Sequence, residues 1–232
     1  MITVRKATDR GSVNLGWLDS KHSFSFGEYQ DPEHMGFGKL RVINDDRVEA
    51  GQGFGTHPHR DMEIISYIID GALEHKDSMG NGFVMRADDV QRMTAGSGIT
   101  HSEFNHSNDA QVHFLQIWIE PAENSLEPGY EQKSFSKNEK LDQLRLVVSH
   151  DGRQGSLLIH QDADMYASVL TEGTELVHSF EPGRRGWIQV VSGKVSANGE
   201  KLNTGDGASI EDESELVLRS HGDAEFVLFD LA

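Results

Sequence analysis

The chain carries the stretch Gly51-Gln-Gly-Phe-Gly-Thr-His57-Pro-His59-Arg-Asp-Met-Glu63, which runs straight into an apolar segment at residues 64–69. Two histidines separated by one residue thus follow a glycine-rich run. If this run is a strand, both histidine side chains point to the same face, and their Cα atoms lie about 6–7 Å apart. That spacing allows two imidazole rings to close on one metal ion. Pro58 between them indicates an edge strand or a bulge, because proline donates no ladder hydrogen bond.

A second pair with the same spacing, His101-Ser-Glu103, follows later in the chain. Two such pairs on facing strands would supply three neutral nitrogens and one carboxylate oxygen. This donor set suits a divalent transition metal and leaves coordination positions open. The sequence therefore predicts a metal site formed by His57, His59, His101 and Glu103.

Composition limits the partners. The chain has 232 residues and a formal net charge of −17, so a phosphate backbone would be repelled and we expect no direct nucleic-acid binding. It has no cysteine, which excludes disulfides and thiolate ligands. The opening residues contain no long apolar stretch, so we expect no signal peptide, no membrane span and a cytoplasmic location. A protein partner is compatible with this surface.

Short apolar runs broken by Gly, Asp and Asn-Gly dominate the chain, and no amphipathic helix interrupts them. Residues 112–119 are apolar on both faces, as in a strand packed between two layers. The pattern predicts an all-β protein with a connector at residues 121–136. Further strands are expected at 144–148, 156–160, 166–170, 187–191 and 225–231.

A weak internal repeat relates the two halves. Residues 64–71 and their following hairpin resemble residues 187–193 and theirs. Aligning the repeats puts no second ligand set in the C-terminal half, since the positions that correspond to the predicted ligands hold Ser179, Glu181, Leu218 and Ser220. We therefore expect a metal-binding domain at residues 1–132 and a domain without metal at residues 133–232.

These motifs resemble the cupin signatures. Gly51, His57, His59 and Glu63 are spaced as in the first cupin motif, and residues 98–105 are similar to the end of the second. Gly96 stands where the second motif usually has proline, and Glu103 falls in a normally variable stretch. Together with His22-Ser-Phe-Ser-Phe-Gly27, Asp31-Pro-Glu-His-Met-Gly-Phe-Gly38, Leu40-Arg-Val-Ile-Asn-Asp-Asp46 and His57-Pro-His-Arg60, these departures resemble the pirin family, and more narrowly the bacterial pirin-like quercetin 2,3-dioxygenases.

The resemblance implies a bicupin, with two jelly-roll-like β-barrels in tandem and one metal held by His57, His59, His101 and Glu103. It also implies addition of O₂ to a flavonol such as quercetin, with ring opening and release of carbon monoxide. Glu103 would be a ligand or the catalytic general base. Iron is expected first as the metal, and nickel, manganese, copper, cobalt and zinc also accept such ligands. We expect no organic cofactor.

Two other functions fit the same residues. The protein could be a non-catalytic, redox-responsive regulator that binds a protein partner, as some pirins are, or a different small-molecule cupin such as an isomerase. Glu63 is expected to be structural, and Gln116 is a buried amide that could face the substrate. The remaining histidines without a partner at ligand spacing are expected to be surface or hydrogen-bonded residues: His22, His34, His75, His106, His113 and His160.

Overall fold

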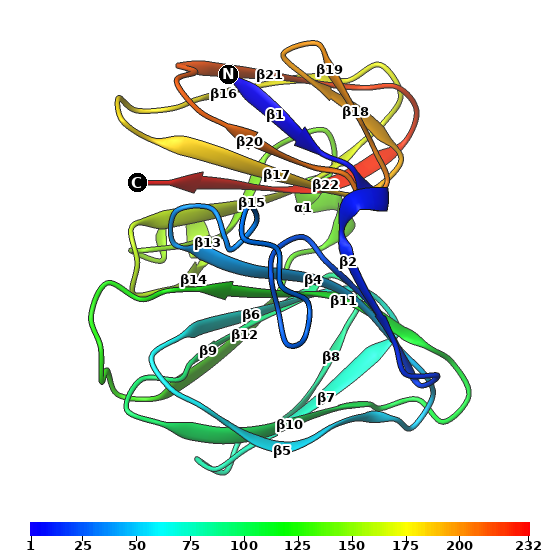
Figure 1. Cartoon of the computed structure of the whole chain (residues 1–232), viewed down its shortest axis with the longest axis vertical. Helices are drawn as coiled ribbons and strands as arrows, with labels where there is room; N and C mark the ends of the chain where they lie inside the picture. The colour runs from blue at the N-terminus through cyan, green and yellow to red at the C-terminus, as the bar shows by residue number, and fades with distance from the viewer. The chain divides into compact units, whose positions relative to one another are not determined.

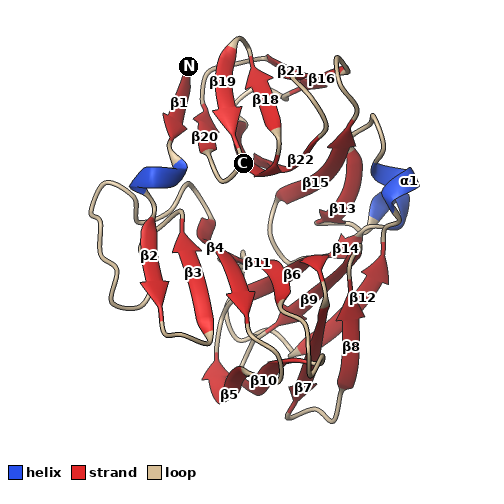
Figure 2. Cartoon of the chain, turned by 90° about the vertical axis from the view of Figure 1, so that its right-hand side faces the viewer, coloured by secondary structure: helices blue, strands red, loops and turns tan.

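Strands form almost all of the regular structure in the computed structural model, which describes residues 1–232 (Figure 1). The exceptions are one four-residue helix, α1 (Lys137–Lys140), and two 3₁₀ turns, η1 (Ala7–Asp9) and η2 (Arg153–Gly155). Figure 2 shows the same dominance of strands from a second direction. The predicted all-β class is confirmed. None of the helices has the length and apolar character that crossing a membrane requires.

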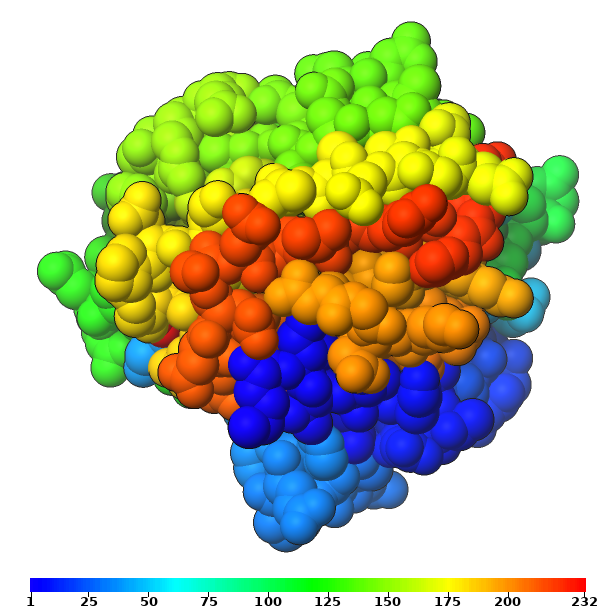
Figure 3. Space-filling model, turned by 90° about the horizontal axis from the view of Figure 1, so that it is seen from above, coloured from blue at the N-terminus to red at the C-terminus, as the bar shows by residue number.

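The chain divides into two compact units, and the first ten residues belong to the C-terminal one. The N-terminal unit comprises Gly11–Phe135 and Leu157–Gln161, and the C-terminal unit comprises Met1–Arg10, Ser136–Ser156 and Asp162–Ala232. The predicted division at residues 132/133 was linear, whereas strand β1 (Ile2–Arg5) pairs with β20 (Gly207–Ile210) near the other end of the chain. Figure 3 shows the first residues, in dark blue, beside the orange atoms of this unit.

Two antiparallel sheets build the N-terminal unit. The larger has the order β12-β9-β6-β11-β4-β3-β2, and the smaller has the order β5-β10-β7-β8. The short strand β14 (Leu157–Leu158) also belongs to this unit. In chain order the other strands are β2 (Gly11–Asn14), β3 (Leu18–His22), β4 (Leu40–Val48), β5 (Gly53–His59), β6 (Glu63–Asp70), β7 (Ala72–Asp77), β8 (Gly82–Arg86), β9 (Asp89–Thr94), β10 (Ile99–Asn105), β11 (Val112–Ile119) and β12 (Gly129–Ser134).

Apolar side chains from both sheets form one core cluster of this unit. Ile68 and Phe114 from the large sheet pack with Leu73 and Met85 from the small sheet, and all four are almost completely buried. Burying a side chain of this size contributes about 1.5–3 kcal/mol. Through this apolar cluster the two sheets pack face to face. In another part of the space between the two sheets, polar side chains lie together.

The C-terminal unit repeats the two-sheet plan. Its larger sheet contains the order β1-β20-β17-β22-β15-β13, and its smaller sheet has the order β16-β21-β18-β19. The Asn-Gly hairpin is confirmed, because Asn198 and Gly199 have positive φ between the paired residues Ala197 and Glu200. The remaining strands are β13 (Arg145–Ser149), β15 (Ala163–Leu170), β16 (Glu175–Ser179), β17 (Arg185–Ser192), β18 (Lys194–Ala197), β19 (Glu200–Asn203), β21 (Glu215–Ser220) and β22 (Ala224–Leu231).

The contact between β5 and β10 depends on Gly53. A Cβ atom at Gly53 would lie 2.3 Å from the carbonyl oxygen of Glu103 and 2.5 Å from the Cα atom of Phe104, whereas a Cβ atom at Gly55 would meet nothing within 4 Å. The glycine at position 53 therefore lets β5 approach β10 closely. At Gly55, two residues further along the strand, there is space for a side chain.

We predict that Gly53→Ala lowers the free energy of unfolding by about 1–3 kcal/mol, because the added methyl group forces β5 away from β10. Gly55→Ala is the matched control and should change it by less than about 0.5 kcal/mol. Urea denaturation of both variants, followed by circular dichroism, measures the difference. Equal midpoints for the two variants would contradict the packing described here.

Candidate metal centre

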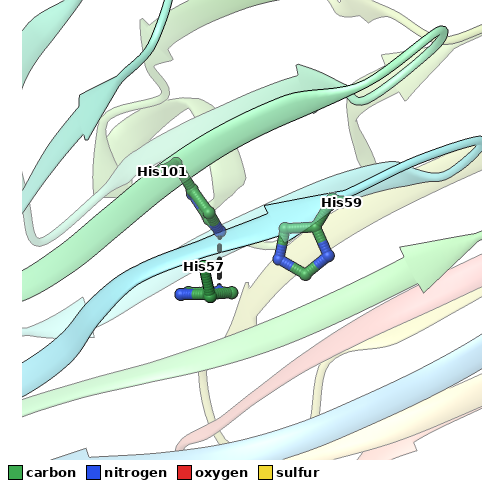
Figure 4. A group of neighbouring side chains, drawn as sticks. All are labelled: His57, His59 and His101. Carbon is green, nitrogen blue, oxygen red and sulfur yellow. Dashed lines mark hydrogen bonds between the residues drawn. The ribbon is translucent and has the colours of Figure 1, made fainter.

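Three histidines from two strands converge in the N-terminal unit. His57 and His59 lie on β5, and His101 lies on β10, directly opposite His57 in the antiparallel register. Ring centroids are 4.5 Å apart for His57 and His101, and 4.8 Å apart for each of the other two pairs. Figure 4 shows the rings facing one another. Pro58 is accommodated because β5 is the edge strand of its sheet.

The closest nitrogens in this cluster are Nε2 of His57 and Nε2 of His101, which are 3.1 Å apart, as the dashed line in Figure 4 marks. Two imidazole nitrogens bound to one ion at about 2.0–2.1 Å lie about 3 Å apart, so this separation fits a shared metal ion. Nδ1 of His57 donates a hydrogen bond of 2.7 Å to the carbonyl oxygen of Gly55. That bond leaves the lone pair on Nε2, the nitrogen that faces His101.

Two histidines of this cluster, His59 and His101, resist protonation. Burial, together with the neighbouring histidines, lowers the pKa of His59 to about 4 and that of His101 to about 3. Both imidazoles are therefore neutral at neutral pH, which is the state that binds a metal. The donor set and its geometry fit a divalent transition ion.

Glu103 is buried, and neutral donors surround its carboxylate. Oε1 accepts hydrogen bonds from Gln91 Nε2 at 2.8 Å and from Ser66 Oγ at 3.3 Å, and Oε2 accepts one from Gln116 Nε2 at 2.7 Å. These bonds fix the direction of both oxygens. Gln116 thus points into the unit, as expected for a buried amide that needs partners.

Glu103 and the three histidines do not form a single group of four potential ligands in the structure. His57, His59 and His101 form one group with ligand atoms within 4.8 Å of one another, and Glu103 forms a second such group with His101 and His75. The pairing of β10 with β5 shifts register between His101 and Glu103, so that Glu103 lies opposite Phe54. The role of Glu103 as a ligand therefore stays a prediction.

His75 on β7 is the site residue that the sequence did not single out. It is completely buried, and its ring lies 5.3 Å from that of His101. His75 and Asp77 lie opposite Glu103 and His101 in the β7–β10 register. A signal was present, since His75-Lys-Asp77 is a third pair with one residue between its members.

Glu63 lies outside both groups of potential ligands. Its carboxylate is fully buried, accepts a hydrogen bond of 2.9 Å from Thr94 Oγ1, and pairs with Nδ1 of His160 at 3.0 Å. These contacts agree with the structural role expected for Glu63. His160 is hydrogen-bonded, as expected for a histidine without a partner at ligand spacing.

Aromatic side chains flank the histidine cluster. The ring of Trp118 lies 5.0 Å from that of His59, and the ring of Phe26 lies 5.3 Å from that of Trp118. An open hollow of about 470 Å³ adjoins His59 and is lined by Pro58, His59, Arg60, Ser78, Gly98, Ile99 and Thr100. The cluster is thus bordered by the aromatic ring of Trp118 and by an open hollow beside His59.

Two units of paired antiparallel sheets, one with a histidine cluster between its strands, define a bicupin with a candidate metal centre. Comparison with known proteins agrees with this class. The family described as Pirin matches residues 3–119, and the family described as Quercetinase C-terminal cupin domain matches residues 146–231. The chain belongs to the pirin family, and the predicted bicupin architecture is confirmed.

Relatives resemble the chain over its whole length. A quercetin 2,3-dioxygenase of Escherichia coli K12 is 51% identical over 100% of this chain and 99% of its own, and a pirin-like protein of Caulobacter vibrioides is 40% identical over 98% and 99%. A crystal structure of the Escherichia coli bacterial pirin YhhW in complex with nickel(II) superposes with a TM-score of 0.95, at 51% identity over 100% of this chain and 99% of that chain.

We predict that the depressed pKa values of His59 and His101 are visible in the metal-free protein. Their rings should stay neutral at pH 5.5, and nitrogen chemical shifts in an NMR titration should report this. The unfolded chain takes up the same protons near pH 6.5, so the free energy of unfolding should fall as the pH drops from about 6.5 to about 4. Titration of both rings near pH 6.5 would contradict the burial seen here.

Proposed function

We propose that this protein is a metal-dependent dioxygenase that cleaves a flavonol such as quercetin with O₂ and releases carbon monoxide. The observation that carries the proposal is the cluster of His57, His59 and His101, in which the Nε2 atoms of His57 and His101 are 3.1 Å apart. The relatives named quercetin 2,3-dioxygenase support the substrate class. The nickel(II) complex of the relative YhhW supports a divalent metal ion as the cofactor.

The proposed metal ligands are His57, His59 and His101, with Glu103 as a fourth ligand or as a base. A divalent transition ion bound there would lower the pKa of a substrate hydroxyl group and act as a Lewis acid. Iron is the ion expected from the family resemblance, and nickel is supported by the complex of YhhW. Either ion accepts imidazole and carboxylate ligands.

Glu103 is suited to take the proton from the substrate hydroxyl group. Its carboxylate is held in one orientation by three uncharged hydrogen-bond donors, which belong to Ser66, Gln91 and Gln116. A carboxylate that is held in one orientation close to the proposed metal site can accept a proton from a bound substrate. Trp118 and Phe26 would pack against the flat rings of a flavonol and exclude water on that side.

A protein partner and a cytoplasmic location stay predictions from the sequence. The alternative of a redox-responsive regulator uses the same metal ligands, so activity toward quercetin separates it from the dioxygenase. Loss of flavonol absorbance with release of carbon monoxide supports the enzyme. A metal-loaded protein that leaves quercetin unchanged under O₂ would reject it.

We predict that His101→Ala removes most of the bound metal and abolishes quercetin turnover, while the protein stays folded. Loss of a direct ligand should lower metal affinity by more than the factor of about 10–100 that is typical of outer-shell changes. Elemental analysis, circular dichroism and flavonol absorbance measure the three effects. His106→Ala is the matched control, because His106 is exposed and lies outside both groups of potential ligands. Full metal occupancy in His101→Ala would refute the ligand assignment.

A second prediction separates the two roles of Glu103. If Glu103 is the base, Glu103→Gln should lower kcat by about 10²–10⁴-fold and leave the metal content unchanged. If Glu103 is a ligand, the metal content should fall together with kcat. Parallel measurement of nickel stoichiometry and single-turnover rates decides between them. A variant with unchanged rate and unchanged metal would contradict both roles.

A further inference from the structure

A chain of hydrogen bonds extends from the histidine cluster to a buried carboxylate on β7. Nδ1 of His101 lies 3.4 Å from Nδ1 of His75, and Nε2 of His75 lies 3.1 Å from Oδ2 of Asp77. The side chains of His75 and Asp77 are fully buried. The strand order of the small sheet brings these residues together, because β10 pairs with β5 on one side and with β7 on the other.

We infer that Asp77 and His75 are positioning residues that fix the tautomer and the ring orientation of His101, so that its Nε2 lone pair faces the metal site. This inference rests on the proposed metal-dependent function. It assigns a role to two residues that make no direct contact with the proposed metal ligands His57 and His59.

The direction of the hydrogen bonds follows from Asp77. Its Oδ2 accepts a hydrogen bond of 2.8 Å from Asn81 Nδ2, and its Oδ1 accepts hydrogen bonds from the backbone nitrogens of Met79 and Asn81 at 2.9 and 3.1 Å. A carboxylate that receives these donors is ionised and can only accept a further hydrogen bond. The proton of His75 is therefore on Nε2, and its Nδ1 carries a lone pair.

The same argument then applies to His101. Because Nδ1 of His75 is an acceptor, its 3.4 Å contact with His101 is a hydrogen bond only when Nδ1 of His101 is the donor. In the metal-free protein a second acceptor competes for this proton, because Nε2 of His57 carries a lone pair and lies 3.1 Å from Nε2 of His101. The carboxylate thus favours, through one intervening ring, the form of His101 in which Nε2 is free to bind a metal.

Aromatic packing holds the intermediate ring in place. The ring of Tyr130, on β12, stacks on His75 with centroids 4.7 Å apart and an angle of 30° between the planes. Phe83 in turn stacks on Tyr130, with centroids 5.2 Å apart and an angle of 11°. This stacking and the hydrogen bond of 3.1 Å to Asp77 favour one orientation of the ring. The orientation of His75 is therefore set by packing, and its tautomer is set by Asp77.

The test begins with nickel(II) affinity, measured by isothermal titration calorimetry on the full chain. Asp77→Asn can still accept the two backbone hydrogen bonds through Oδ1, but its amide nitrogen would face Nε2–H of His75. His75 then has to move its proton to Nδ1, which forces the proton of His101 onto Nε2 and blocks the ligand atom. We expect the affinity to fall by about 10–100-fold.

Two substitutions of His75 separate the hydrogen bond from the packing. His75→Phe keeps a ring for Tyr130 to stack on but provides no acceptor, and we expect the same 10–100-fold loss. His75→Asn places an amide oxygen near the former Nδ1 and should recover most of the affinity. Asn81→Ala is the control for the hairpin, because it removes a contact to Asp77 without touching His75 and should bind nickel like the wild type.

Nitrogen NMR of the metal-free proteins provides the second readout. Wild-type His101 should carry its proton on Nδ1 in a larger fraction of molecules than Asp77→Asn and His75→Phe, in which the proton should shift toward Nε2; a role limited to packing would leave the tautomer unchanged. Wild-type affinity and an unchanged tautomer in His75→Phe would overturn the inference. Loss of nickel in His75→Phe as complete as in His101→Ala would also overturn it, since His75 would then be a ligand. If the wild type binds no metal, the proposed function fails, and the tautomers alone decide the inference.

Discussion

The site depends on one structural constraint, which is the antiparallel register of β5, β10 and β7. In this register His57, His101 and Asp77 lie opposite one another, and Glu103 lies opposite His75 in the next inward-facing row. A slip of one residue would turn each of these side chains to the other face of the sheet. Gly53 allows the close approach of β5 to β10, so the backbone of the edge strand is part of this constraint.

Hydrogen bonds among buried side chains stabilise the carboxylate of Glu103 inside the N-terminal unit. Gln116, Ser66 and Gln91 are opposite in register on β11, β6 and β9, and they direct their donors at the carboxylate of Glu103. A buried carboxylate without such partners would cost several kcal/mol. The apolar cluster that contains Ile68 and Phe114 contributes favourable burial energy to the same unit. The arrangement gives the candidate site rigid surroundings and one open side.

Much of the fold could be predicted from the sequence, because its signals are local. The Asn-Gly dipeptide at residues 198–199 predicts the hairpin that forms there, and the apolar run at 112–119 predicts the central strand β11. The pairing of β1 with β20 could not be predicted, since it joins opposite ends of the chain and leaves no local pattern. For the same reason a linear boundary could not place Met1–Arg10 in the C-terminal unit.

The sequence by itself determined the all-β class, the family and the shared face of His57 and His59, because side chains two residues apart on a strand must share a face. The pairing of β5 with β10, which brings His101 to them, belongs to the tertiary structure. Only the tertiary structure decided what surrounds them. It directs Gln91 and Gln116 at Glu103 and brings His75 and Asp77 behind His101. The physical reason is that the neighbour of a strand is chosen by the packing of the whole sheet, and the partners of a buried polar group follow from that choice.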